Sequence, residues 1–238
     1  MRKNRIIAID GPAGSGKSTT AKQVAKRLGF TYLDTGALYR ALTLLALKNG
    51  IDIESEGELV NLLQQSKFQL QSQGDKIRIW INGEEATEAI RSPEVSRAVS
   101  MVARHPAVRR EMVQLQRRLA SQADVVVEGR DIGTVVFPEA DLKIFLTASL
   151  EARAQRRLKE LHEKGVEISL HELKRDIERR DAIDSQRETA PLKKAEDAIV
   201  IDTTELTIDE QVDKIVQAFR AAAEQRRKSS DASGVKNT

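Results

Sequence analysis

The chain has 238 residues, enough for one sizeable α/β core that can carry inserted subdomains. Its 39 lysines and arginines nearly balance 36 acidic residues, and only 3% of the residues are aromatic. These values disfavour a nucleic-acid-binding protein, because basic tracks and stacking platforms are both missing. The lack of cysteine excludes disulfides and a thiol nucleophile. No membrane partner is expected, since the apolar run Ile6–Ile9 is too short for a signal peptide or a membrane span. We expect a cytoplasmic monomer.

The first part of the chain predicts a strand, a loop and a helix. Ile6–Ile9 ends at Asp10 like a buried parallel strand before a tight turn, and apolar residues then repeat at helical spacing up to Gly29. Further on, isoleucines alternate with polar residues, and Asn82-Gly83 is a two-residue hairpin signal. We therefore expect an antiparallel β-ribbon over about residues 67–87.

The second half of the chain alternates short apolar runs with charged stretches of helical length. The runs lie at residues 125–127, 142–146 and 198–201, and a final amphipathic helix is predicted from Ile208. This alternation favours a parallel sheet covered by helices, with the ribbon and further helices inserted between its second and third strands.

Local signals predict helix starts, surface residues and a tail. Ser92-Pro93-Glu94 has the form of an N-cap followed by proline at the first helical position, and a second helix is expected from Pro106. The three histidines have polar neighbours and are expected on the surface; they are His105, His162 and His171. From about Glu224 the sequence becomes small, polar and charged, which predicts a flexible tail.

A phosphate-binding loop follows the first strand. Residues 11–18 match GxxxxGK[S/T] completely, between a predicted strand and a predicted helix. Backbone N–H groups of such a loop point at phosphate oxygens, while Lys17 would reach the β and γ phosphates and the Ser18 hydroxyl would ligate Mg²⁺. The residues expected to contact ATP are Gly11, Pro12, Ala13, Gly14, Ser15, Gly16, Lys17, Ser18 and Thr19. The loop does not specify a reaction, because switches, motors, kinases and nucleotide sensors all use it.

Arginines cluster where an α/β sheet places its ligands, at the carboxyl ends of strands. Arginine suits bidentate phosphate recognition, although any single one could instead form a surface ion pair, and Glu128 or Asp131 could be a structural carboxylate. The groups are Arg40 after Asp34-Thr35-Gly36, the segment Glu128-Gly129-Arg130-Asp131, and Arg180, Asp181, Asp184 and Arg187.

A fourth basic group lies between two later strands and could form a lid over ATP or a solvated pair of helices. It comprises Arg153, Arg156, Arg157, Lys174, Arg175, Arg179 and Arg180.

Taken together, these segments resemble the bacterial cytidylate kinases, over about residues 4–220. The resemblance is carried by IDGPAGSGKST at 9–19, LDTGALYR at 33–40, VVEGRDIGTVVFP at 126–138, KIFLTAS at 143–149 and RRDAIDSQRETAPL at 179–192. It implies an α/β fold: an adenylate-kinase-like P-loop NTPase core with a five-stranded parallel sheet, an inserted subdomain for the nucleoside monophosphate with an antiparallel β-ribbon, and a lid. The implied division is a kinase core of residues 1–50 and 105–222, a lid at about 153–175, a CMP-binding subdomain of residues 51–104 and a flexible polar tail of residues 224–238.

The resemblance also implies a role for each matching residue. Arg40, Arg130 and Arg187 would hold the CMP phosphate, and Ser100, Arg109 and Asp131 would read cytosine. Arg180 and Asp184 would contact the sugar, and Thr35 and Tyr39 would line the pocket. The residues expected to act in catalysis are Lys17, Arg130, Arg187, Arg153 and Arg157.

The implied reaction moves the γ-phosphoryl group of ATP to CMP or dCMP. Cytosine has an amino donor at N4 where uracil has an acceptor at O4, so the Asp131 carboxylate would accept from CMP and repel UMP. The attacking phosphate oxygen is already anionic, which explains why no general base stands out. Two alternatives stay open: another P-loop small-molecule kinase, and a nucleotide-binding regulatory module without transfer chemistry.

Overall fold

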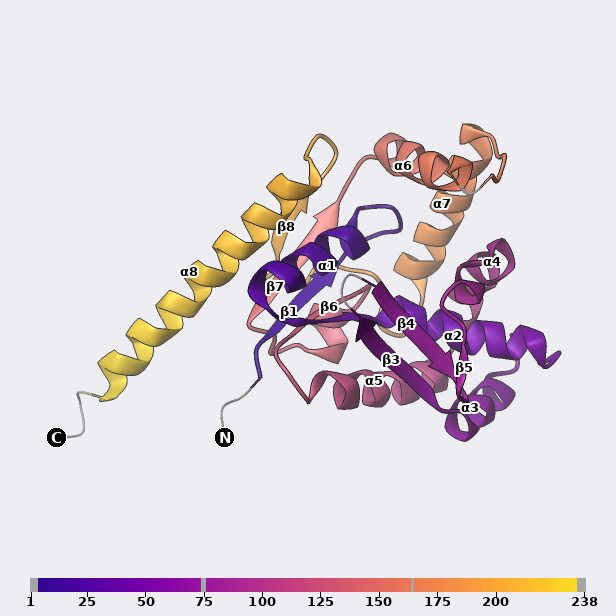
Figure 1. The fold of residues 1–238 in the computed structure, drawn as a ribbon, viewed down its shortest axis with the longest axis horizontal. Coiled ribbons are helices and arrows are strands. Elements are labelled where there is room, and N and C mark those ends of the chain that lie inside the picture. The colour runs from indigo at the N-terminus through magenta and orange to yellow at the C-terminus, as the bar shows by residue number, and fades with distance from the viewer. Residues whose placement is uncertain (1–3, 74–75, 164, 235–238) are drawn as a thin grey trace.

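The structure, a computed structural model, describes residues 4–73, 76–163 and 165–234. A five-stranded sheet forms its centre, with all strands parallel in the order β2-β6-β1-β7-β8 (Figure 1). The strands are β1 (Ile6–Asp10), β2 (Thr31–Asp34), β6 (Val125–Gly129), β7 (Leu142–Thr147) and β8 (Ile199–Asp202). The predicted α/β class and the five-stranded parallel sheet are confirmed.

Both faces of this sheet are covered over the central strands β1 and β6, which explains their nearly continuous apolar sequences, whereas Ile199 and Val200 of the edge strand β8 are exposed. Ile7 and Ile9 of β1 pack on the side of α1 (Lys17–Leu28) and α8 (Ile208–Gly234). Ala8 points to the opposite side, where the end of α5 (Pro106–Ala120) and the turn η2 (Ile132–Val136) cover the sheet. Strand residues alternate between faces, so one short run supplies two cores.

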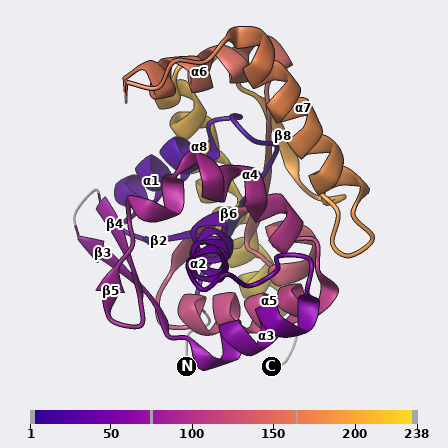
Figure 2. The ribbon, with the colours of Figure 1, turned by 90° about the vertical axis from the view of Figure 1, so that its right-hand side faces the viewer.

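A separate antiparallel sheet lies beside the core, which confirms the β-ribbon predicted over about residues 67–87 (Figure 2). It contains β3 (Phe68–Gln73), β4 (Lys76–Ile81) and β5 (Glu84–Glu85). The β4–β5 turn places Asn82 and Gly83 at φ values of 53° and 89°. Two successive positive φ values are what the Asn-Gly pair tolerates best, so this pair sets the hairpin.

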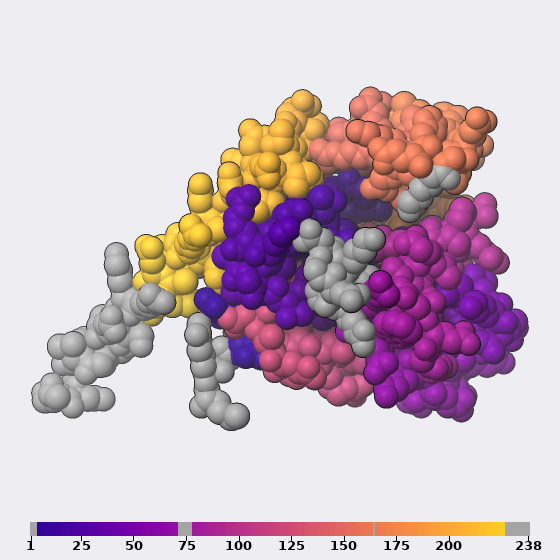
Figure 3. Space-filling model, in the orientation of Figure 1, coloured from indigo at the N-terminus to yellow at the C-terminus, as the bar shows by residue number. Residues whose placement is uncertain are grey.

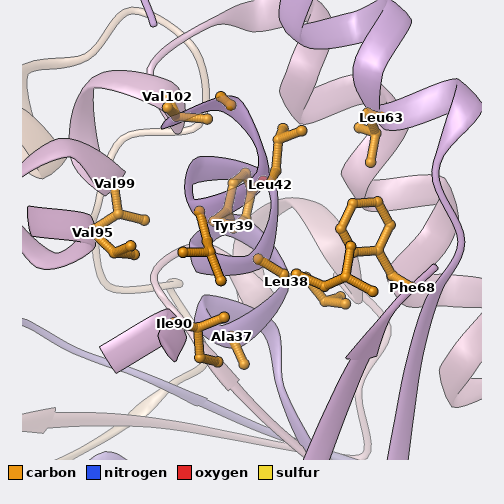
Figure 4. Close-up of a cluster of buried hydrophobic side chains, with 14 of the residues drawn as sticks. Ala37, Leu38, Tyr39, Leu42, Leu63, Phe68, Ile90, Val95, Val99 and Val102 are labelled. Atoms are coloured by element: carbon orange, nitrogen blue, oxygen red, sulfur yellow. The ribbon is translucent and has the colours of Figure 1, made fainter. Parts of the chain in front are cut away.

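A second hydrophobic cluster is built around α2 (Thr35–Lys48) (Figure 4). Leu38 and Leu42 of this helix are fully buried, with Phe68 of the ribbon on one side and Val99 of α4 on the other. The remaining elements of this region are α3 (Glu56–Gln65), η1 (Ala89–Arg91) and α4 (Pro93–Val102). The inserted segment therefore shares a core with α2, the helix that follows the second strand.

Two helices rise from the carboxyl edge of the main sheet. They are α6 (Leu150–His162) and α7 (Leu170–Gln186), and they pack against each other. The Ser169 hydroxyl accepts the Glu172 N–H while the Glu172 carboxylate accepts the Ser169 N–H, a capping box that starts α7. In Figure 3 the orange surface of these helices overhangs a recess that shows indigo atoms of the N-terminal part of the chain.

Two local expectations differ from the structure. His105 is buried, and its Nε2 lies 2.8 Å from the Ile53 carbonyl oxygen, so the prediction of a surface histidine was wrong there. Sequence neighbours did not reveal this partner across the fold. His162 and His171 are exposed as expected.

The final helix is longer than the sequence suggested. α8 continues through Gly234, although an irregular tail was expected from Glu224. Residues 221–228 are mostly strong helix formers without glycine or proline, so the helix propagates beyond its packed part. Residues 235–238 of the expected tail lie outside the described residues. None of the described helices combines the length and apolarity needed to cross a membrane.

Candidate active site

The phosphate-binding loop leaves β1 at the carboxyl edge of the sheet and leads into α1. Gly11 has a φ of 151°, and a Cβ there would lie 2.1 Å from the Leu146 carbonyl oxygen of β7. The loop therefore passes so close to the neighbouring strand that a side chain is excluded. Gly16, at a φ of 91°, turns the chain into the first turn of α1. The loop therefore connects a strand to a helix, as the sequence pattern predicts.

Lys17 is buried at the base of this loop, and its Nζ donates to the Pro12 carbonyl oxygen at 2.6 Å. Burial and the positive charge of Arg130 lower the pKa of Lys17 to about 7. Arg180 acts in the same direction. The lysine of the donor site therefore lies within electrostatic range of arginines that the sequence assigns to the acceptor site.

The Glu128 carboxylate lies beside the Ser18 hydroxyl. Glu128 at the end of β6 is buried and accepts a hydrogen bond from the Tyr32 hydroxyl. Burial and the charge of Asp34 raise the pKa of Glu128, whereas a hydrogen bond from Ser18 lowers it. A hydroxyl beside carboxylate oxygens is a donor set that suits Mg²⁺. Thr35 completes the corner by donating to the Glu128 carbonyl oxygen at 2.7 Å.

Three arginines from different elements meet beside the P-loop. Arg130 donates to Asp184 of α7 at 2.9 Å, and Arg40 of α2 donates to Ser96 of α4 at 2.8 Å. The Nε of Arg180 is buried and has no hydrogen-bond partner among the described residues. Burial and the charges of Arg130 and Arg40 lower the pKa of Arg180 to about 9. Mutually repelling guanidinium groups held together in this way favour a bound anion.

A more deeply buried ionic cluster lies behind these arginines. Arg109 Nη2 of α5 donates to Asp131 Oδ2 at 2.5 Å, and its guanidinium lies 5.3 Å from the centre of the Tyr39 ring. Arg187 Nη2 is 3.8 Å from the other oxygen of Asp131 and has no hydrogen-bond partner within the described chain. Burial raises the pKa of Tyr39 to about 12, so the ring stays neutral. Ser100 of α4 is also buried, though no contact identifies its partner.

The predicted lid arginines lie in two different environments. Arg153 is buried against the P-loop, where it donates to the Ala13 carbonyl oxygen at 3.2 Å and to Asp181 of α7 at 2.5 Å. Arg157, one turn later, pairs with Glu160 at 2.7 Å and stays partly exposed. Its charge lowers the pKa of Arg40, which places it near the acceptor arginines.

The Arg153 contacts predict a coupling between the P-loop and α7. Arg153→Met is expected to raise the KM for ATP about tenfold, because it removes three hydrogen bonds made by a charged group, to Ala13, Asp181 and the Ala148 carbonyl oxygen. Asp181→Asn should weaken ATP binding less, and the double variant should lose less than the sum of the single losses. Steady-state kinetics with a saturating amount of CMP, the acceptor that the sequence resemblance implies, measure these effects, with Arg179→Met on the exposed side of α7 as the control. Strictly additive losses would contradict the coupling.

Several supporting residues escaped sequence reasoning. Gln211 of α8 is fully buried, and its Oε1 accepts a hydrogen bond from Thr20 of α1 at 2.6 Å. Thr203 Oγ1, at the end of β8, lies 3.0 Å from the Ser15 carbonyl oxygen of the P-loop. Neither residue belongs to a motif. The position of Thr203 after a predicted strand was the one available signal for it.

These features define a class. A P-loop at the carboxyl end of a parallel sheet, with arginines from several elements within electrostatic range of its lysine, is the architecture of a P-loop phosphotransferase. The match to the family model "Cytidylate kinase" spans residues 7–221. The chain belongs to the cytidylate kinase family.

Close relatives agree over nearly the whole chain. A cytidylate kinase of Geobacillus sp. (strain WCH70) is 55% identical over 217 residues, which are 91% of this chain and 97% of the relative. A cytidylate kinase of Enterococcus faecalis (strain ATCC 700802 / V583) is 55% identical over 214 residues, or 90% and 95% of the two chains. A solved structure of an uncharacterized protein from Eubacterium ventriosum, 12% identical, has a TM-score of 0.51, covers 91% of this chain and 99% of its own, and supports the fold alone.

Proposed function

We propose that the protein transfers the γ-phosphoryl group of ATP to CMP or dCMP, giving ADP and CDP or dCDP. The observation that carries this proposal is that basic side chains from other elements lie within electrostatic range of the P-loop lysine: burial lowers the pKa of Lys17, and the charges of Arg130 and Arg180 act in the same direction. Direct transfer between two bound phosphates needs such proximity, because the reacting oxygen and phosphorus must come within about 3–3.5 Å.

The donor site consists of the P-loop residues 11–19. Their backbone N–H groups and Lys17 hold the ATP phosphates. Ser18, with the Glu128 carboxylate beside it, fits Mg²⁺, which when bound neutralises charge on the β and γ phosphates. Residues 153–175 form the lid over this site, with Arg157 facing the phosphates and Arg153 bracing the loop from behind.

The acceptor site lies between the sheet edge and the subdomain of residues 51–104. Arg40, Arg130 and Arg187 hold the CMP phosphate, and Arg180 and Asp184 contact the sugar. This assignment is supported by the buried guanidinium nitrogens of Arg180 and Arg187 that have no hydrogen-bond partner among the described residues. Buried donors of this kind are costly unless a ligand satisfies them.

Cytosine selection rests on Asp131, Arg109 and Ser100. The Asp131 carboxylate accepts the N4 amino group of cytosine, and the Arg109 guanidinium donates to its O2 and N3. The ion pair between the two side chains holds the carboxylate in place at 2.5 Å. Uracil would face the same carboxylate with an acceptor oxygen, so the site rejects it. Thr35 and Tyr39 form the neighbouring wall.

Catalysis on this proposal requires no general base. A phosphate oxygen of CMP attacks the γ-phosphorus of ATP, and the bond to the β–γ bridging oxygen breaks as ADP leaves. Lys17, Arg130 and Arg187 stabilise the charge on the transferring group, and closure of the lid excludes water. The proposed enzyme acts as a monomer in the cytoplasm.

A panel of acceptors tests the proposed function. With ATP and Mg²⁺, we expect kcat/KM for CMP and dCMP to exceed that for UMP, AMP or shikimate by at least about tenfold, read as ADP production. Mixtures without an acceptor give the background ATPase rate. If another acceptor outran CMP tenfold, or if ATP bound without any CMP-dependent ADP release, the proposal would be wrong.

A further inference from the structure

Asp10, the last residue of β1, is a buried carboxylate for which the proposed reaction gives no role. It is 4% exposed, and both of its oxygens accept backbone hydrogen bonds from the segment after β6. Oδ1 accepts the Ile132 N–H at 2.8 Å, and Oδ2 accepts the Gly133 N–H at 2.7 Å. The two N–H groups belong to the residues that directly follow Asp131. A residue of the P-loop strand therefore fixes the start of the segment that carries the proposed base reader.

The turn η2 explains why those two N–H groups need an acceptor. Its first N–H groups have no carbonyl partner within the turn, as at the start of any helix. Asp131 stands at the N-cap position, where an aspartate ordinarily accepts such an N–H with its own side chain. Here the Asp131 side chain makes no capping hydrogen bond. Asp10 supplies both acceptors from the neighbouring strand.

The same fold contains the ordinary arrangement for comparison. Asp34 ends β2 and is the N-cap of α2, and its Oδ1 accepts the Ala37 N–H at 3.0 Å. Asp34 and Asp131 thus follow two adjacent parallel strands and both precede a helical turn. The first caps its own turn, whereas the second directs its carboxylate to Arg109 and Arg187.

We propose that Asp10 is a positioning residue for nucleobase selection: by capping the turn at residues 132–136 in place of Asp131, it leaves the Asp131 carboxylate free to read the base. This inference rests on the proposed cytosine-reading role of Asp131. Without the Asp10 carboxylate, the Ile132 and Gly133 N–H groups would be unsatisfied, and Gly133 holds the second helical position, which an N-cap aspartate ordinarily caps. If Asp131 capped the Gly133 N–H, its carboxylate would turn away from the base.

The test measures CMP-over-UMP selectivity, the ratio of the two kcat/KM values, in Asp10→Asn and Asp10→Ala. Assays at pH 8 keep Asp10 ionised, because burial raises its pKa to about 6. The amide of Asp10→Asn can accept one N–H while its NH₂ group opposes the other, and Asp10→Ala accepts neither. We expect selectivity to fall about tenfold in Asp10→Asn and further in Asp10→Ala. Asp10→Asn keeps the test valid if Asp10→Ala does not fold.

Asp141→Asn is the matched control. Asp141 Oδ2 accepts the Ile6 N–H at 2.8 Å and its Oδ1 pairs with Arg226, so a carboxylate also holds the opposite end of the same strand through a backbone N–H. Thermal melts should show that Asp141→Asn loses stability, while its selectivity remains that of the unmodified protein. A fall in turnover with CMP and UMP alike in Asp10→Asn, or an equal loss of selectivity in Asp141→Asn, would overturn the inference.

Asp131→Asn separates this inference from the proposed function. If Asp131→Asn loses selectivity and Asp10→Asn does not, the positioning role fails while base reading by Asp131 stands. If Asp131→Asn keeps full selectivity, base reading itself fails and the inference fails with it. Combining Asp10→Asn with Asp131→Asn should cause no selectivity loss beyond that of Asp131→Asn, because both changes act through one carboxylate.

Discussion

Lys17→Met is expected to lower kcat about a thousandfold with every acceptor. The lysine is buried among the P-loop carbonyl and hydroxyl groups and lies near Arg130, so no other ammonium group can replace it at the transferring phosphoryl group. Removal of one preorganised donor to transition-state charge costs about 10²–10³ in rate, and the change also removes the ammonium group that a bound phosphate would keep protonated. ADP release with saturating ATP and CMP measures the effect.

Lys26→Met is the control for this experiment. Lys26 lies in the last turn of the same helix and is exposed, so its replacement should leave kcat within about twofold of the unmodified protein. A Lys17→Met protein that melts normally and retains more than about a tenth of the activity would refute the assigned role.

Asp131→Asn is expected to reduce CMP-over-UMP selectivity at least about a hundredfold. A site built to hydrogen-bond one substrate group rejects an analogue without it by large factors, because buried polar groups are left unpaired. Asparagine keeps the size of the side chain but can turn its NH₂ group towards the uracil O4, which makes UMP acceptable. Initial rates over a range of CMP and UMP concentrations give the ratio.

ATP recognition should survive this change. The KM for ATP in Asp131→Asn should stay within about threefold of its original value, because Asp131 contacts Arg109 and Arg187 rather than the P-loop. Ser185→Ala changes an exposed residue of α7 and is the control variant, which should keep the selectivity and the melting temperature of the unmodified protein. Unchanged selectivity in a folded Asp131→Asn protein would exclude Asp131 as the base reader.

The P-loop and the parallel sheet could be predicted because each depends on local signals. A GxxxxGK[S/T] pattern between a strand and a helix contains all the information its backbone needs, including the glycine that passes β7. The hairpin at Asn82-Gly83 is equally local, since two positive φ values select that pair. The sequence analysis singled out arginines near the ends of predicted strands, and in the structure Arg40, Arg130 and Arg180 lie within electrostatic range of one another.

Contacts between distant segments could not be predicted in the same way. Arg153 and Arg157 are one helical turn apart and look equivalent in the sequence, yet one is buried against Ala13 and the other is partly exposed. The difference arises from how deeply α6 packs, which no local pattern encodes. His105 was placed on the surface for the same reason, because its partner Ile53 lies 52 residues away. In the sequence Asp10 is only the end of a predicted strand. Its two hydrogen bonds to the segment after β6 could not be predicted, because they depend on the pairing of β1 with β6.

The arginine cluster has a consequence for the lifetime of the protein. Burial and the charges of Arg130 and Arg40 lower the pKa of Arg180, and Asp184 offsets only part of this repulsion, so some of it remains in the folded state without bound phosphate. Bound nucleotides relieve it, and a ligand that binds the folded state lowers the population of unfolded chains in proportion to its saturation. The nucleotide concentration would thus affect both the reaction rate and the degradation of the protein. At low nucleotide concentration a larger fraction of the protein would be unfolded and open to proteases, and at high concentration a smaller fraction would be.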